Sequence, residues 1–232
     1  MKVLVVGAGH GDDLPLTRLA QATARVDLLD LDADALRWAR RRVPRRLRRR
    51  IRVGALDVTG GGADAVVAMA ADPPPDLRVP AEPIGDAPYD LVIGDLLYSQ
   101  LLGPSLPHLG LSAAEELTFL YEHGQRLTDA VVARMHASAP RGIVVHVHDV
   151  LGWWGGHEQP LGLYTVIERA RKTPADADRV LAGGRPAEGC DPRRSLTALG
   201  YPVLRTSWWH WPFQLGVDYL VCATEAGGAL RH

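Results

Sequence analysis

The sequence predicts a three-layer α/β sandwich built on a mostly parallel sheet. Short apolar runs alternate with stretches of helical spacing along most of the 232 residues, which is the pattern of right-handed β–α–β units. The first run leads straight into glycines at alternate positions, and four of the runs end in an aspartate. Because ligands bind such sheets at the carboxyl ends of the strands, the same pattern predicts a ligand site there.

The first strand and the turn after it carry the strongest local signal. Residues 3–6 are all apolar, as in a buried parallel strand, and Gly7, Gly9 and Gly11 follow. Glycine tolerates positive φ and, lacking Cβ, lets a ligand lie against the backbone. A helix over residues 14–24 would then present free N–H groups at its start. The turn is therefore the predicted centre of a binding site.

The later elements follow the same alternation. Apolar runs predict strands, and apolar residues at helical spacing predict the helices between them. Six prolines within residues 72–88 predict an ordered connection inside the domain. The strands are predicted at 3–6, 25–31, 51–58, 89–95, 142–150, 202–207 and 217–224, and the helices at 14–24, 34–42, 63–71, 113–139 and 192–199, with an aromatic turn between the last two strands.

Helix ends are marked by capping residues. Ser112 and Glu115 have capping-box spacing at the start of the longest helix, which Gly124 is expected to bend. Asp191 precedes Pro192 as the expected N-cap of the last helix.

Composition limits the class of protein. Apolar residues make up 47% of the chain and charged residues 23%, as in a globular protein with a sizeable core. The two cysteines, Cys190 and Cys222, lack the spacing of a disulfide scaffold or a thiolate zinc site, which is typical of a reducing cytosol. No apolar run reaches the roughly 18 residues of a membrane span. We therefore expect one cytoplasmic domain over residues 1–232, with no membrane partner.

The glycine turn departs from the dinucleotide-binding pattern. That pattern has its third glycine where Asp12 stands, whereas Gly11 comes one place early. An acid at this position would repel a phosphate. Together with Asp30, Asp57 and Asp95 at later strand ends, it favours a cationic or hydroxyl-rich ligand.

In order and spacing, these motifs resemble those of the class I, Rossmann-like S-adenosylmethionine-dependent methyltransferases. The resemblance covers residues 1 to about 150 and rests on Val6-Gly7-Ala8-Gly9-His10-Gly11, Leu29-Asp30-Leu31-Asp32, Leu56-Asp57-Val58 and the run from Tyr89 to Asp95. It implies a three-layer Rossmann-like sandwich with a seven-stranded sheet whose last strand is antiparallel. It also implies S-adenosylmethionine as the cofactor and methyl transfer as the reaction.

The resemblance further implies a role for each motif. The turn formed by Gly7, Ala8, Gly9 and Gly11 would lie under the methionine and ribose parts of the cofactor. Asp30, with Leu31 beside it, would bind the ribose hydroxyls. Asp57 would contact the adenine amino group, the Val58 N–H would face the ring, and Asp95 would face the reacting centre.

One element of the family pattern is missing. Val5 stands where an acid usually precedes the glycine turn. The amino group of the methionine part would therefore rely on Asp12, Asp13 or backbone carbonyls.

Asp95-Leu96-Leu97-Tyr98 has the spacing of the Asn/Asp-Pro-Pro-Tyr motif of amino-methyltransferases. In that motif the acid or amide holds an amino group beside the methyl, and the tyrosine stacks on its plane. Leucines replace both prolines here, which weakens the inference to nucleobase or glutamine acceptors. Asp95 remains the candidate beside the sulfonium, and Tyr98 is either a substrate contact or a core residue.

The fifth strand carries His146, His148 and Asp149. A His-x-His pair with an acid could hold a metal, but histidines within a strand more often pack and hydrogen-bond locally, so no metal site is predicted. His148 and Asp149 are candidate general bases for an oxygen or carbon nucleophile.

Five of the six tryptophans fall in two short stretches that follow strand ends. Glycine-flanked tryptophans in loops are not typical of a core, and they suit an apolar or cation-binding pocket. The candidate pocket residues are Trp153, Trp154, His157, Trp209 and His210, with core packing as the alternative. Residues 96–111 and 151–189 are expected to cover the site.

The predicted function is methyl transfer from S-adenosylmethionine to a small-molecule acceptor. Arginines crowd residues 37–52, but with only Trp38 among them stacking on bases is poorly provided for, which disfavours nucleic acid as a partner. Three alternatives stay open. They are an enzyme that transfers or cyclises the aminobutyrate chain of the same cofactor, a nucleic-acid methyltransferase, and a binding protein without catalysis.

Overall fold

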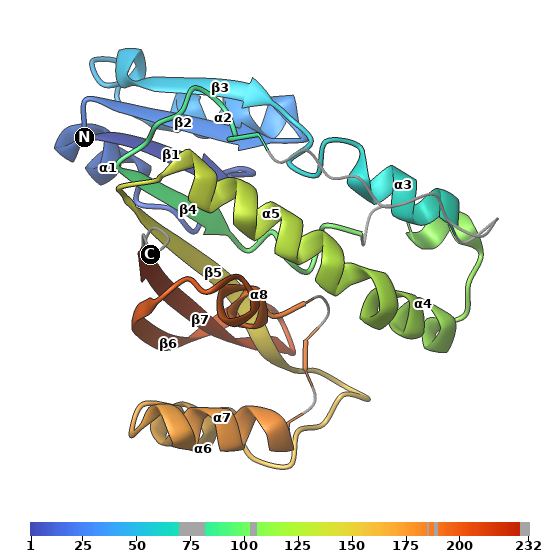
Figure 1. Cartoon of the computed structure of the whole chain (residues 1–232). Coiled ribbons are helices and arrows are strands. Elements are labelled where there is room, and N and C mark those ends of the chain that lie inside the picture. Colours follow the sequence, from blue (N-terminus) through green and yellow to red (C-terminus); the bar gives the residue numbers. More distant parts are fainter. Residues whose placement is uncertain (70–81, 103–105, 185, 188–189, 228–232) are drawn as a thin grey trace.

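A computed structural model describes residues 1–69, 82–102, 106–184, 186–187 and 190–227. These residues form one seven-stranded sheet in the order β3-β2-β1-β4-β5-β7-β6, with helices on both faces (Figure 1). The strands are β1 (Lys2–Val6), β2 (Arg25–Asp30), β3 (Ile51–Ala55), β4 (Leu91–Asp95), β5 (Ile143–Trp153), β6 (Val203–Gln214) and β7 (Val217–Gly227). The first five strands pair in parallel and β7 runs antiparallel to β5 and β6. The predicted fold class is confirmed.

The sheet is buried on both faces along β1. Alternate residues of this strand point to opposite sides, so an unbroken apolar run fills two cores. Val3 and Val5 pack in the cluster that contains Leu16 and Leu36, whereas Leu4 packs with the helices of the other face.

The α-helices of both faces are α1 (Leu16–Ala22), α2 (Ala33–Arg42), α3 (Gly62–Met69), α4 (Ala113–Phe119), α5 (Gln125–Ser138), α6 (Leu163–Ala170), α7 (Pro174–Gly183) and α8 (Pro192–Leu199).

The predicted long helix is present, with a π-helical turn at the glycine where a bend was expected. A π-helical turn over Leu120–Gly124 joins α4 to α5. A side chain on Gly124 would begin 2.9 Å from the Cys190 sulfur, which explains glycine there. The capping box also forms, because the Ser112 N–H donates to Glu115 Oε2 at 2.8 Å. Asp191 caps α8 by accepting from the Arg193 N–H at 2.9 Å.

Two expectations about the C-terminal half were wrong. The aromatic stretch at residues 208–213 is not a turn but lies inside β6, where aromatic side chains are well accommodated. The fifth strand does not end near residue 150 but continues to Trp153, past a bulge between Asp149 and Leu151. The connection between β6 and β7 is a tight turn at Gly216, which has a φ of 76°.

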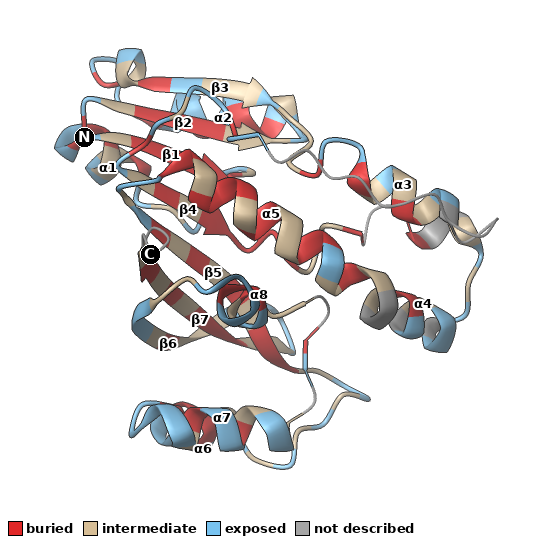
Figure 2. Ribbon diagram, in the orientation of Figure 1, coloured by how far each residue is buried: buried red, intermediate tan, exposed pale blue. Residues whose placement is uncertain are grey.

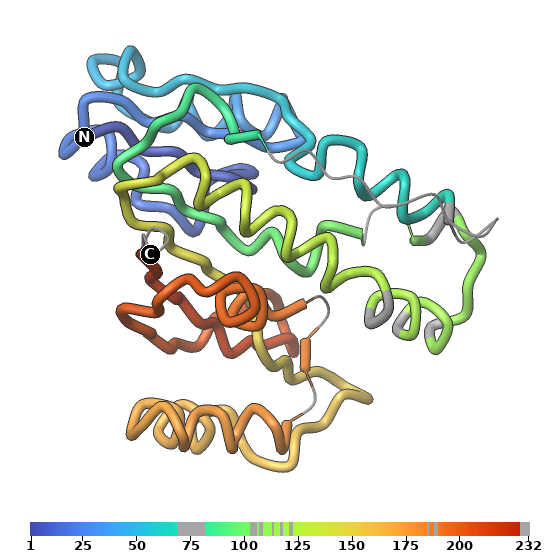
Figure 3. Tube along the Cα trace, in the orientation of Figure 1, coloured from blue at the N-terminus to red at the C-terminus, as the bar shows by residue number. Residues whose placement is uncertain are grey.

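The region between β5 and β6 contains two helices that the sequence analysis did not predict. Thr173 caps α7 and Pro174 opens it, a start signal that is readable in the sequence. The chain path in Figure 3 carries α6 and α7 beyond β6, away from α3. In Figure 2 both helices turn exposed residues outward, whereas β1 and the middle of β7 are mostly buried.

Parts of four predicted segments lie outside the described residues. These are most of the connection at 72–88, the end of the helix at 63–71, residues 103–105 of the covering segment 96–111, and residues 185 and 188–189 of the covering segment 151–189. Across the described ranges, no helix is both long enough and apolar enough to cross a membrane.

Candidate functional site

A cavity of about 450 Å³ opens at the carboxyl ends of β1, β2 and β4. This is the position where β1 lies between β2 and β4, so the order of strands reverses along the chain. Six of the residues predicted to bind a cofactor line the cavity together, namely Gly7, Asp30, Leu31, Asp57, Val58 and Asp95. The predicted site residues after the first strands therefore converge, and the volume suits a small-molecule ligand.

The glycine turn contributes Gly7 to the lining of the cavity, whereas the predicted residues Ala8, Gly9 and Gly11 do not line it. Gly7, Gly9 and Gly11 have φ values of 77°, 43° and 67°, in the left-handed region that favours glycine. A Cβ on Gly7 would lie 2.8 Å from the Asp95 carbonyl oxygen and 2.9 Å from Leu97 Cβ. A Cβ on Gly9 would meet open space. Gly7 is therefore required for packing against the segment after β4, while Gly9 keeps the turn uncrowded.

Asp30 fixes the turn to the end of β2. Its two carboxylate oxygens accept from the Gly9 N–H at 2.8 Å and from the Asp32 N–H at 2.9 Å. A carboxylate accepts about four hydrogen bonds, so both oxygens keep capacity for ligand hydroxyls. Asp32 has a different task, since it caps α2 by accepting from the N–H groups of Asp34 and Ala35.

Asp57 shapes the opposite end of the cavity. Its carboxylate accepts from the Thr59 N–H at 2.8 Å, from the Thr59 hydroxyl at 2.7 Å and from the Gly61 N–H at 2.5 Å. Burial opposes ionisation of this acid, but these hydrogen bonds outweigh it and lower the pKa of Asp57. The carboxylate is thus held ionised and in one orientation.

Arg134 is a site residue that the sequence analysis missed. It projects from α5, is only 7% exposed, and donates to the carbonyl oxygens of Val58 and Glu82. It therefore holds the backbone of a cavity-lining residue in place. The sequence signal that could have identified Arg134 is its position on the face of the predicted helix that also carries Val131 and Met135.

Asp95 is the unusual acid of the site. It lines the cavity at 8% exposure, and among the described residues no donor reaches its carboxylate. Burial first, and then the charge of Asp13, raises the pKa of Asp95 to about 7. Leaving a buried carboxyl unpartnered is costly, and a perturbed acid in a cavity is a candidate for function.

Asp12 and Asp13 interact with different groups of the protein. Asp12 forms an ion pair with Arg42 of α2. Asp13 is close enough to Asp95 to raise the pKa of that carboxyl. Neither acid lines the cavity, but of the two that could replace the one missing before the glycine turn, Asp13 is the one whose charge acts on Asp95.

The segment after β4 does not have the backbone of the Asn/Asp-Pro-Pro-Tyr motif. Leu96 has a φ of 50°, whereas proline fixes φ near −65°, so the first proline of that motif could not adopt this conformation. Tyr98 is 3% exposed and does not line the cavity. Its hydroxyl pairs with His146 Nδ1 in the core, and burial raises its pKa well above 10. Tyr98 was expected to be either a substrate contact or a core residue, and its placement is that of a core residue.

His148 and Asp149 point to opposite faces of the sheet. Asp95 is paired with Val147, so Asp149, two residues on, shares the face of Asp95. The Ser99 hydroxyl donates to Asp149 at 3.3 Å and links it to the segment after β4. His148, at 2% exposure, lies on the α8 side with Nε2 3.0 Å from Asp191.

The other strand histidine is also buried in protein contacts. His146 Nε2 lies 3.2 Å from His136 Nε2, and burial lowers the pKa of both rings, that of His136 to about 4. These histidines are therefore neutral at physiological pH. No cluster of three metal-ligating side chains occurs among the residues the structure describes.

The predicted aromatic pocket divides between the two faces. Trp209 and Asp149 are both paired with Val221, so they share a face. Trp154 stacks on His157 with ring centroids 4.0 Å apart. On the other face, the Trp153 indole donates to the Leu161 carbonyl at 3.1 Å and His210 pairs with Asp218 at 2.6 Å. None of the five predicted pocket residues lines the 450 Å³ cavity.

Two of the ten arginines at residues 37–52 hold helix ends. Arg50 donates to the carbonyl oxygens of Ala20, Gln21 and Thr23 at the end of α1, at distances of 2.9 to 3.2 Å. Arg48 donates to the carbonyl oxygens of Arg41 and Val43 after α2. These contacts give Arg48 and Arg50 a structural role.

Taken together, the strand order, the antiparallel β7 and the cavity at the switch point define a Rossmann-like α/β fold of the methyltransferase type. The structure is similar to that of an S-adenosylmethionine-dependent methyltransferase from Methanosarcina mazei, with a TM-score of 0.53 and 14% identity over 99% of this chain and 93% of that chain. A second such enzyme, from Anabaena variabilis, matches with a TM-score of 0.50 and 12% identity over 98% of this chain and 77% of that chain.

The sequence comparisons add no closer relative. No family model matches the chain, and no curated protein matches it in sequence. At identities of 12 to 14%, the similar structures establish a common fold, and the chemistry has to be argued from the site.

Proposed function

We propose that this protein is an S-adenosylmethionine-dependent methyltransferase that acts on a small molecule. One observation carries the proposal. Five carboxylates, those of Asp30, Asp32, Asp57, Asp64 and Asp95, are among the residues lining the 450 Å³ cavity, and no lysine or arginine of the described ranges is. Such a cavity repels phosphate-bearing dinucleotides and attracts a cation with hydroxyl and amino donors.

The residues present fit this cofactor from end to end. Asp30 offers free acceptor positions to the ribose hydroxyls from the end of β2. At the adenine end, Asp57 is held ionised, and among the described residues no protein acceptor takes the Val58 N–H. Asp13 supplies a carboxylate for the amino group of the methionine part. The unpaired carboxylate of Asp95 is left to face the sulfonium.

When bound, the cofactor supplies a methyl group that is already activated for displacement. The protein then has to orient the acceptor and exclude water, and proximity accounts for most of the rate. Asp95 and Asp149 share the sheet face that also carries Trp209. We place the acceptor on this face, with Asp95 accepting a proton where the nucleophile carries one.

Binding and product analysis test the proposal. Calorimetry should detect S-adenosylmethionine and S-adenosylhomocysteine, and NAD should not bind. Incubation with S-adenosylmethionine and a library of small amines, phenols and carboxylates should yield S-adenosylhomocysteine. Methylthioadenosine as the product would instead identify an enzyme of the aminobutyrate chain, and no binding of either cofactor form would falsify every enzymatic reading.

Replacing Arg134 with glutamine is expected to weaken binding of S-adenosylhomocysteine about tenfold. The Val58 and Glu82 carbonyls lose a charged donor, which also costs about 2 kcal/mol of stability. Arg126→Gln is the matched control, because Arg126 is exposed on the same helix. Calorimetry measures the affinities and urea unfolding the stabilities. Equal affinities for the two variants would show that Arg134 does not position the adenine end.

A further inference from the structure

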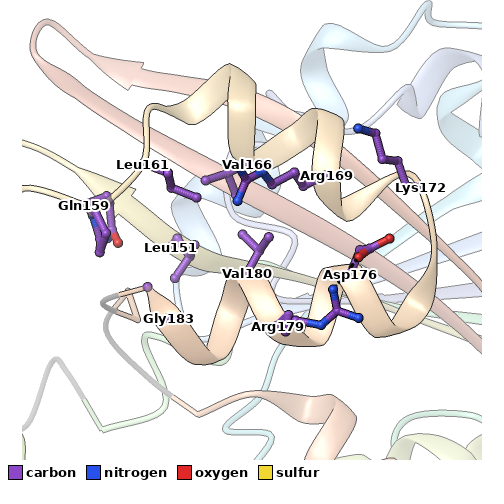
Figure 4. A pocket seen from close by; sticks show the side chains of 12 residues that line it. Leu151, Gln159, Leu161, Val166, Arg169, Lys172, Asp176, Arg179, Val180 and Gly183 are labelled. Carbon is purple, nitrogen blue, oxygen red and sulfur yellow. Dashed lines mark hydrogen bonds and ion pairs between the residues drawn. The ribbon is translucent and has the colours of Figure 1, made fainter.

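A second cavity, of about 430 Å³, lies between α6 and α7 and shares no lining residue with the cavity of the proposed function. Its apolar wall is formed by Leu151, Leu161, Val166 and Val180. Leu151 and Val166 are each 2% exposed. Figure 4 shows Val166 and Arg169 reaching from α6 towards Val180 of α7, with Leu151 of β5 beside them.

The walls of this cavity are fixed by the fold. After the bulge in β5, Leu151 forms an antiparallel bridge with Pro186, and the Ala187 N–H donates to the Val150 carbonyl at 2.9 Å. Gly184 lets the chain after α7 pack closely against Leu151 of β5, because a Cβ on Gly184 would lie 2.8 Å from Leu151 Cδ2. The Gln159 amide is anchored on the Gly152 carbonyl at 2.8 Å. The space is therefore a built feature of the region between β5 and β6.

The rim of the cavity is cationic. Arg169, Lys172 and Arg179 line it against one acid, Asp176. Arg179 pairs with Asp176 at 3.0 Å and Lys172 with Glu168 at 3.4 Å. Within the part of the chain that the structure describes, Arg169 has no carboxylate partner. An apolar wall beside an unpaired guanidinium is complementary to an apolar molecule with one anionic end.

We propose that the cavity between α6 and α7 binds an aliphatic carboxylate. The chain lies against the partly exposed side chain of Leu161, over the buried side chains of Leu151, Val166 and Val180, where it removes apolar surface from water. The carboxylate meets Arg169, whose planar guanidinium can donate two parallel hydrogen bonds. Asp176 and Glu168 restrict the site to a single negative charge, since they would repel a larger polyanion. This site is independent of the proposed methyl transfer.

Titration with decanoate, below its aggregation concentration, tests the proposal. The full chain should bind one decanoate saturably. Arg169→Glu should weaken binding at least about tenfold, because it replaces an attractive charge with a repulsive one. Val180→Phe should weaken it by filling the apolar wall. Arg126→Glu, the same change at an exposed position of α5, should leave the affinity unchanged, and so should the presence of S-adenosylhomocysteine.

Two further probes separate the sources of affinity. Acetate should not bind, because it lacks the chain, and decanol should bind more weakly than decanoate. Circular dichroism checks that each variant is folded. Absent binding of decanoate, or equal loss in Arg169→Glu and Arg126→Glu, would overturn the proposal. So would sedimentation with anionic phospholipid vesicles without saturable decanoate binding, which would identify a membrane-contacting surface instead.

Discussion

Replacing Asp95 with asparagine is expected to lower the rate of methyl transfer at pH 8 by at least about a hundredfold, the usual contribution of a positioned acid–base group. The pKa of about 7 means that the carboxylate is ionised above neutral pH and protonated below it. The kcat/KM of the unchanged protein for S-adenosylmethionine, which reports the free enzyme, should therefore rise with pH through about 7. The rate of Asp95→Asn should be flat over this range. Rates are measured from pH 5.5 to 8.5 by formation of S-adenosylhomocysteine.

A binding measurement checks the same residue without catalysis. S-adenosylmethionine carries a sulfonium charge that S-adenosylhomocysteine lacks, so only the first gains from an ionised Asp95. The preference for S-adenosylmethionine should grow roughly tenfold between pH 6 and pH 8, and this growth should vanish in Asp95→Asn. A preference that is independent of pH in the unchanged protein would place the sulfonium elsewhere.

Measuring the free energy of unfolding distinguishes a loss of catalysis in Asp95→Asn from misfolding of the variant. The pKa of Asp95 is higher in the folded protein than in the unfolded chain, so the folded state holds its proton longer as pH rises. Ionisation of Asp95 therefore costs stability progressively from about pH 4 to pH 7, by about 4 kcal/mol in all. Asp95→Asn should be more stable than the unchanged protein at pH 8 and no more stable at pH 4. Lost activity in a more stable variant cannot come from unfolding.

The fold could be predicted because its signals are local. Val3 to Val6 are buried on both faces of the sheet, which gives a continuous apolar run, and Gly7 then occupies a backbone position with positive φ. Asp30, Asp57 and Asp95 come together because parallel strands bring their carboxyl ends to one edge. None of this requires knowledge of side-chain partners.

The roles of the site residues on β5 and β6 could not be predicted in the same way, because they depend on how these strands pair with their neighbours. Whether His148 or Asp149 faces Asp95 is decided by the pairing of β4 with β5. The aromatic residues of β6 are likewise divided between two faces by their pairing with β7. Arg134 was missed because its partners are backbone carbonyls far away in sequence. Alternation and pairing across strands, rather than residue type, determine these roles.

Replacing Asp30 with alanine is expected to weaken binding of S-adenosylhomocysteine about a hundredfold. The change removes two hydroxyl acceptors and also frees the Gly9 and Asp32 N–H groups that hold the glycine turn. The effect should reach both cofactor forms equally, because the proposed binding mode has Asp30 facing the ribose and not the sulfonium. This pattern distinguishes Asp30 from Asp95, whose loss should act on S-adenosylmethionine alone.

Two neighbouring acids supply matched controls for Asp30. Asp32→Ala removes the cap of α2 and should cost about 1 kcal/mol of stability, with a much smaller change in affinity. Asp34→Ala removes an exposed charge of the same helix, which forms an ion pair with Arg37, and should change neither quantity. If all three variants lost affinity equally, the general negative potential of the cavity would be responsible. If only Asp30→Ala does, the glycine turn and the ribose are recognised through one carboxylate at the end of β2.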